Sequence, residues 1–208
     1  LTETYLASLD GKLGVEPMIF SQFPVVSFGT TYSANDNVTD SSASGTALST
    51  GVKTVNTHLG LDENDNMLTT IAEKAKRSGR KVGIATSVGI NHATPAAFYA
   101  HQPDRNLFYK ISLDMIKADF DFYSGAYFEK KNKLEDGTKV RNITEVMEEA
   151  GYSIAYGIDD FDLKCKDADK MVLLPAPKKG ISYGIDRIGL GRDELTLEDI
   201  PRSAIDFL

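Results

Sequence analysis

The chain has 208 residues, of which 41% are hydrophobic, and this length supplies one sizeable core, so we predict a single domain over residues 1–208. Its net charge of −7 argues against a nucleic-acid-binding surface, although it does not exclude an anionic substrate, because a local site can be positive on an acidic protein. No apolar run of about 18 residues is present, so we predict no membrane span.

The N-terminal part begins without the features of a signal peptide, because Leu1–Thr4 has neither a basic start nor an apolar stretch. Tyr5–Leu9 is amphipathic and precedes a turn at Asp10-Gly11. Pro24–Phe28 is typical of a short buried strand. The polar stretch Thr30–Asn37 predicts a loop that leads into the next element.

Hydroxyl-bearing and small residues dominate Val38–Lys53, which contains a single acid, Asp40. Asp40 or Ser41 can cap a following helix, and the small residues beyond the cap would let that helix pack closely against its neighbours. A serine at such a terminus lies where backbone N–H groups and the helix dipole favour anions. The position suits a nucleophile that attacks a phosphate, while the alternative is a Ser/Ala/Gly linker or a closely packed core helix.

Apolar residues at helical spacing predict a helix over 68–75. Thr70 and Glu73 have the spacing of a capping box, and Gly79 provides the C-terminal stop. The preceding acidic stretch Asp62–Asn66 resembles a calcium loop only in composition. It lacks the glycine and the terminal glutamate at the required positions, so we interpret it as an exposed turn.

The segment after the predicted strand Lys81–Val88 carries a second group of candidate site residues. Ligands of α/β sheets gather at the carboxyl ends of strands, so His92, Thr94 and Arg105 are expected at the edge of a site. Pro95 can open a helix at its first position. Taken alone, a single histidine is more often structural or exposed than a ligand.

Helical and strand patterns alternate along the rest of the chain. Helices are predicted at 107–118, 143–150 and 195–208, and strands at 120–125, 152–156 and 171–174. This alternation favours an α/β fold, a three-layer sandwich in which helices cover both faces of a largely parallel central sheet.

Two features of the C-terminal half give no separate function. Gly189-Leu190-Gly191 fails the dinucleotide pattern because position 194 is Glu, so we interpret 178–191 as a solvated loop, with a phosphate-cradling loop as the alternative. The single cysteine, Cys165, excludes an internal disulfide, and we interpret it as incidental.

The order of residues in two segments resembles the alkaline phosphatases. Val38–Lys53 resembles the nucleophile segment V-T-D-S-x-A-S/G-x-T-A followed by S/T-G-x-K, and His92–Ala96 resembles a D/H-A-T-P-A segment that an arginine follows. Phe120–Phe128 loosely resembles the strand-turn D-V-x-x-G-G. The resemblance implies an alkaline-phosphatase-like fold and hydrolysis of phosphate monoesters through a phosphoserine, in an extracytoplasmic homodimer.

The resemblance also implies a role for each matched residue. Ser41 would be the phosphorylated nucleophile and a zinc ligand, and Thr94 would give its hydroxyl to magnesium. His92 would lie at the edge of the magnesium site, through water. Arg105 would bind two phosphate oxygens while Asp40 holds it in place. The family implies two zinc ions and one magnesium ion in the full-length protein.

Several metal-ligand segments of that family are not found in this sequence. They are an initial D-G-M-G, a glutamate, a D-x-x-x-H segment, a D-H pair and a further histidine. We therefore expect an internal fragment, incomplete at both ends of the fold, that binds zinc poorly and hydrolyses phosphomonoesters weakly or not at all. Exposed apolar sheet edges are expected to favour self-association.

Two alternatives stay open beside the monoesterase. A related metal-dependent phosphodiesterase or sulfatase usually carries threonine or a modified cysteine as nucleophile, so Asp40-Ser41 and Arg105 favour the monoesterase. A non-catalytic anion-binding α/β module would hold phosphate equally well without metal. The spacing of the three histidines does not point to a Ser-His-Asp triad.

Overall fold

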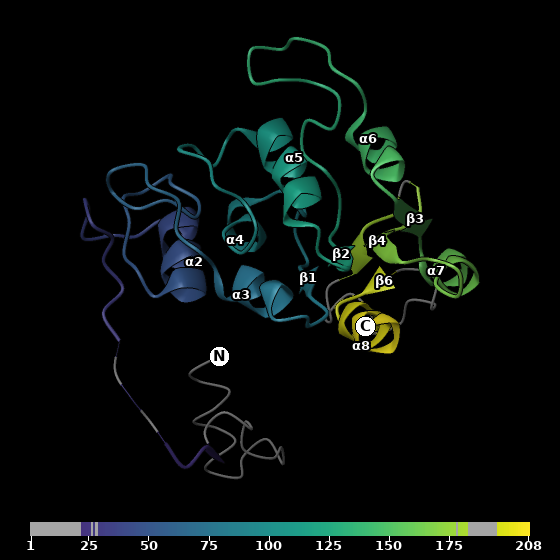
Figure 1. Cartoon of the computed structure of the whole chain (residues 1–208), viewed down its shortest axis with the longest axis horizontal. Coiled ribbons are helices and arrows are strands. Elements are labelled where there is room, and N and C mark those ends of the chain that lie inside the picture. The colour runs from purple at the N-terminus through teal and green to yellow at the C-terminus, as the bar shows by residue number, and fades with distance from the viewer. Residues whose placement is uncertain (1–21, 26, 28, 178, 183–194) are drawn as a thin grey trace. The chain divides into compact units, whose positions relative to one another are not determined.

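The computed structural model describes residues 22–25, 27, 29–177, 179–182 and 195–208 (Figure 1). The predicted amphipathic start at 5–9, the turn at 10–11 and Gly189–Gly191 lie outside the described residues. The chain divides into two units, Leu1–Thr30 and Thr31–Leu208. The central sheet and its helices belong to the second unit, and the single domain over 1–208 stays a prediction.

The strand predicted at Pro24–Phe28 is wrong for the three of its residues that are described. Pro24, Val25 and Ser27 lie in no strand, and Val25 is 80% exposed. A short apolar run forms a strand only where a neighbouring strand shares its backbone hydrogen bonds, and hydrophobicity alone does not supply that neighbour.

A four-stranded parallel sheet forms the centre of the second unit, in the order β1-β2-β4-β3. Its strands are β1 (Gly83–Ala85), β2 (Phe122–Ser124), β4 (Lys170–Leu174) and β3 (Tyr152–Tyr156). The register aligns Ala85 with Ser124 and Ser124 with Leu173, so the carboxyl ends lie at one edge. The predicted parallel sheet is therefore confirmed.

Successive side chains of the strands enter two separate hydrophobic clusters, as the period of two requires. Tyr123 and Val172 belong to the larger cluster. Phe122 and Met171, their neighbours in the chain, belong to the smaller one. Each face of the sheet thus has its own core, and the predicted three-layer α/β fold is confirmed.

Helices cover both faces of the sheet. The larger cluster includes residues of α3 (Ile71–Arg77), α4 (Ala93–Ala96), α5 (Phe108–Ala118) and α6 (Ile143–Glu149). The smaller cluster includes residues of α7 (Ile158–Lys164), α8 (Asp199–Phe207) and the two-stranded pair β5 (Ile181–Ser182) and β6 (Leu195–Thr196). Figure 1 shows α8 on the opposite side of the strands from α5. The helix α2 (Ser41–Thr50) precedes these elements in the chain.

A local capping signal predicted α3 well, although the helix begins at Ile71 rather than at 68. The Thr70 hydroxyl accepts from the Glu73 N–H, and the Glu73 carboxylate accepts from the Thr70 N–H, which forms the predicted capping box of α3. Gly79 follows with φ of +79°, a conformation that glycine adopts without strain. The Asn142 side chain caps α6 by accepting from the Thr144 N–H.

Three predicted boundaries need correction. The strand predicted at 81–88 has ladder pairing only over Gly83–Ala85, because its partner β2 is equally short. The helix predicted at 195–208 begins at Asp199, after β6, and Pro201 is tolerated in its first turn, where N–H groups have no partner within the helix. Pro95 is the third residue of α4 rather than the first, again within the first turn.

Candidate functional site

The segment Val38–Lys53 contains a helix that begins at Ser41. Asp40 is the N-cap, with extended φ and ψ of −88° and 177°, and its Oδ1 accepts from the Ala43 N–H at 2.8 Å. The Ser42 hydroxyl donates to Asp40 Oδ2 at 2.6 Å. Of the two caps considered, the structure has Asp40, so the exposed Ser41 is the first helical residue.

The carboxylate of Asp40 also faces Arg105. Arg105 Nη1 donates to Asp40 Oδ2 at 3.4 Å, and both side chains are 23% exposed. Burial by itself would raise the pKa of Asp40. Hydrogen bonds from the Ala43 N–H, the Ser42 hydroxyl, the Thr57 N–H and Arg105 outweigh that effect and hold the pKa below its ordinary value. Asp40 is therefore a carboxylate at neutral pH.

A turn at Asn56-Thr57 contacts both members of this pair. Asn56 Oδ1 accepts from the Asp40 N–H at 3.0 Å, and the Thr57 N–H donates to Asp40 Oδ2 at 3.1 Å. The Thr57 carbonyl accepts from the Arg105 N–H at 2.9 Å. Sequence reasoning missed this turn, because nothing local to Asn56-Thr57 signals hydrogen bonds to such distant segments.

Small side chains allow α2 to pack closely against α4, as predicted. A Cβ added to Gly45 would lie 2.8 Å from Ala97 Cβ and 3.4 Å from the Thr94 carbonyl oxygen. The Ser49 hydroxyl donates to the Ala97 carbonyl at 2.6 Å. This packing places the helix that carries Thr94 beside the helix that begins at Ser41.

His92 and Thr94 follow the carboxyl end of β1, as expected. His92 is the N-cap residue of α4 without a side-chain cap bond, and its ring centroid lies 6.3 Å from that of Phe108. Thr94 is exposed. Within the described ranges, no hydrogen bond joins either side chain to Ser41 or Arg105. Asp40 and Arg105 are thus in direct contact, whereas α4 lies beside α2 through helix packing.

The two other histidines have partners away from Ser41. His101 lies with Nδ1 2.8 Å from the Gly60 carbonyl and Nε2 3.0 Å from Glu73 Oε1. His58 Nδ1 lies 3.2 Å from the Asp62 carbonyl. Neither ring forms a hydrogen bond with the Ser41 hydroxyl, so a Ser-His-Asp triad is not assembled in the part of the chain that the structure describes.

The described residues do not make a complete metal centre. Among them, no group of three or more His, Cys, Asp or Glu side chains could hold a metal ion. Ser41, His92 and Thr94 would together supply at most three donors, whereas a zinc site takes four ligands and a magnesium site six. The donor set present does not fit two zinc ions and one magnesium ion, and we assign no catalytic step to a metal.

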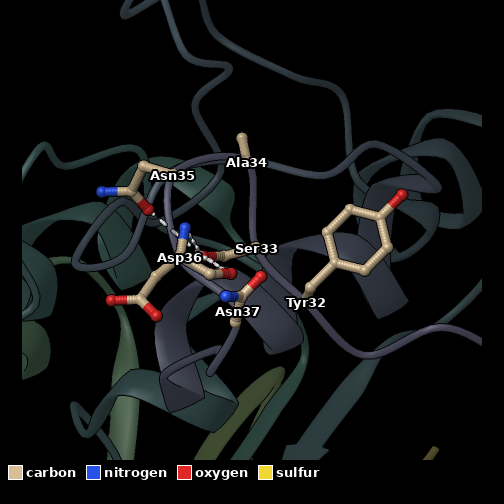
Figure 2. A pocket seen from close by; sticks show the side chains of 6 residues that line it. All are labelled: Tyr32, Ser33, Ala34, Asn35, Asp36 and Asn37. Carbon is tan, nitrogen blue, oxygen red and sulfur yellow. Dashed lines mark hydrogen bonds between the residues drawn. The ribbon is translucent and has the colours of Figure 1, made fainter.

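An open hollow of about 450 Å³ lies in the loop before α2, lined by residues 32–37. Figure 2 shows Ser33, Asn35 and Asp36 joined by hydrogen bonds, with the Tyr32 ring apart from them. Asn35 Oδ1 accepts from the Ser33 hydroxyl at 3.1 Å and from the Asn56 N–H at 2.8 Å. The loop is therefore tied to the turn that contacts Asp40.

Comparison with known proteins identifies the family of this chain. Residues 4–124 match the sequence model of the alkaline phosphatase family. Alkaline phosphatase 4 of Bacillus subtilis (strain 168) is 38% identical over 183 residues, which is 83% of this chain and 36% of that protein. Alkaline phosphatase 3 of the same strain is 33% identical over 202 residues, 93% of this chain and 41% of that protein.

Solved structures agree with the sequence matches. Alkaline phosphatase from the Antarctic bacterium TAB5 superposes with a TM-score of 0.76 at 27% identity, covering 98% of this chain and 58% of that one. The Thermus thermophilus enzyme superposes with a TM-score of 0.71 at 30% identity, covering 86% and 37%. A variant of the TAB5 enzyme has magnesium bound in its M3 site.

The chain belongs to the alkaline phosphatase family. It spans about two-fifths of the length of the two Bacillus relatives. No helix among the described residues has the length and apolar character needed to cross a membrane.

Proposed function

We propose that this chain carries the nucleophile and the phosphate-binding arginine of a phosphomonoester hydrolase. The observation that carries the proposal is the double role of Asp40, which caps the helix of Ser41 and pairs with Arg105 through the same carboxylate. Membership of the alkaline phosphatase family supports the same chemistry.

Arg105 would bind the phosphoryl group. A guanidinium has five N–H donors in a rigid fork, and in the described residues only Nη1 donates to Asp40. The remaining donors suit two oxygens of a phosphoryl group in the bidentate manner that arginine favours. Asp40 fixes the orientation of the guanidinium, which removes part of the entropic cost of binding.

Ser41 would attack phosphorus from the start of α2. The backbone N–H groups of this 10-residue helix and its dipole favour the negative charge of the phosphoryl group. The Oγ–P bond forms as the P–O bond to the alcohol breaks, and the alcohol leaves with the proton that the serine loses. Water then cleaves the Oγ–P bond, releasing inorganic phosphate and restoring the hydroxyl.

The serine needs a group that accepts its proton. The resemblance implies that Ser41 binds zinc, but the described donors do not complete such a site, so we assign no activating group to this chain. That incomplete donor set favours a second candidate, an anion-binding module in which Asp40 and Arg105 hold phosphate without turnover.

Hydrolysis of a chromogenic aryl phosphate separates the two candidates. The chain is assayed with zinc and magnesium, with chelator, and as the Ser41→Ala variant, with Leu48→Ala as a control because Leu48 is 76% exposed on the same helix. Slow, metal-dependent turnover that Ser41→Ala abolishes and Leu48→Ala retains supports the hydrolase. Phosphate binding that chelator leaves unchanged, with no turnover dependent on Ser41, supports the binding module.

A further inference from the structure

Thr57 has a backbone conformation that is unfavourable for its residue type. Its φ is +79°, in the left-handed region, where a β-branched residue is a genuine outlier. Such strain persists only when surrounding contacts fix it, and strained residues cluster at functional sites. Thr57 is also exposed, so burial of its side chain does not explain why the strain is kept.

Three hydrogen bonds hold Thr57 in this conformation. Its N–H donates to Asp40 Oδ2 at 3.1 Å, and its carbonyl accepts from the Arg105 N–H at 2.9 Å. Its hydroxyl donates to the Pro103 carbonyl at 3.2 Å. One residue therefore contacts the carboxylate at the start of α2 and the backbone of the segment that carries Arg105.

The geometry points to a positioning role for Thr57, which sets the arrangement of Arg105 against Asp40 and so prepares the guanidinium for a phosphoryl group. This inference rests on the proposed phosphate-binding role of Arg105. The carbonyl of Thr57 fixes the backbone of Arg105, while its N–H fixes the carboxylate that the guanidinium contacts. The two peptide units on either side of the Thr57 Cα thereby contact the Asp40 carboxylate and the Arg105 backbone.

Replacement of Thr57 by glycine distinguishes the relief of backbone strain at this residue from the loss of its proposed role in positioning Arg105. Glycine accepts a positive φ without steric cost, so Thr57→Gly is expected to raise the melting temperature by about 2–4 °C. The same change removes the hydroxyl bond to Pro103 and frees the backbone, so affinity for inorganic phosphate is expected to fall by about threefold to tenfold, as for one lost hydrogen bond. Thr57→Ser keeps the hydroxyl and is expected to retain the affinity.

Asp119→Gly is the matched control. Asp119 has φ of +53° at the C-terminal end of α5, before the amino end of β2. Asp119→Gly likewise removes a side chain from a residue with positive φ, and this substitution is expected to leave the affinity for phosphate unchanged. Amide hydrogen exchange of Arg105, measured without phosphate, is expected to be faster in Thr57→Gly and unchanged in Asp119→Gly.

The outcomes distinguish this inference from the proposed function. If Thr57→Gly melts at a higher temperature with unchanged phosphate affinity and unchanged exchange at Arg105, Thr57 is only a strained loop residue and the positioning role is overturned. If Arg105→Lys binds phosphate as tightly as the parent chain, the proposed function fails instead. Faster exchange at Arg105 in Thr57→Gly would then still support the coupling of the turn to Arg105.

Discussion

Asp40 and Arg105 are 65 positions apart in the sequence, yet Asp40 Oδ2 lies 3.4 Å from Arg105 Nη1. The contact links the cap of the helix that begins at Ser41 to the segment that follows α4. A single carboxylate thereby serves the helix terminus and the cation at once. This relationship gives the Ser41 segment a physical connection to Arg105, the side chain that we propose binds phosphate.

The cap itself is expected to contribute measurable stability. Asp40→Ala removes the acceptor for the Ala43 N–H and is expected to lower the free energy of unfolding by about 1 kcal/mol. Asp40→Asn retains a capping oxygen and is expected to lose clearly less. Urea unfolding followed by circular dichroism measures both changes. Equal losses in the two variants would mean that charge, rather than capping, is the contribution of Asp40.

Close packing of α2 and α4 makes Gly45 intolerant of a side chain. Gly45→Ala should favour the isolated helix, since alanine is the better helix former by about 1 kcal/mol. The added Cβ would, however, lie 2.8 Å from Ala97 Cβ, so we expect a net destabilisation of about 1–3 kcal/mol. Denaturant titration tests this, with the exposed Leu48→Ala on the same helix as control. A stabilised Gly45→Ala variant would contradict the observed helix packing.

Acid stability is expected to depend on Asp121. Burial alone would raise the pKa of this carboxyl, but hydrogen bonds from Lys76, the Val82 N–H and Lys81 hold the pKa below its ordinary value of 3.8. A lowered pKa in the folded state means that the unfolded chain binds the proton more readily. The resulting stability is therefore present above pH 3.8 and is lost as the pH falls through the lowered value.

Asp121→Asn tests that dependence. It is expected to cost about 1–3 kcal/mol at neutral pH, because the lysines and the Val82 N–H lose a charged acceptor. It is also expected to weaken the decline of stability between about pH 4 and pH 2. Urea unfolding midpoints of the variant and the parent chain, measured across that pH range, test this prediction. An unchanged acid dependence in the variant would show that other carboxylates control it.

The helices with local capping signals were the most predictable part of the fold. The capping box of Thr70 and Glu73 and the side-chain cap at Asn142 depend on neighbours a few residues away, so the sequence contains the whole signal. The α7 helix was not predicted, because acidic residues interrupt its short apolar pattern and packing of Phe161 against the sheet stabilises it. The extent of β1 was also unpredictable, since its pairing depends on β2.

The candidate site was predicted in part. The order of residues indicated Asp40, Ser41 and Arg105, and the structure brings Asp40 and Arg105 into contact. The contribution of Asn56 and Thr57 could not be predicted, because backbone bonds to Asp40 and Arg105 leave no trace in the local pattern. The roles of Ser41, His92 and Thr94 in catalysis or metal binding stay predictions.

Titration of the chain with inorganic phosphate, followed by NMR at the backbone amides, tests the phosphate site most directly. We predict saturable shifts at the amides of Ser41 and Arg105, with an affinity that Arg105→Lys lowers by about tenfold because lysine cannot form the bidentate contact. Arg141→Lys, an exposed exchange of the same type, is expected to leave the affinity unchanged. Absence of shifts at the start of α2, or equal affinity in Arg105→Lys, would contradict phosphate binding at this site.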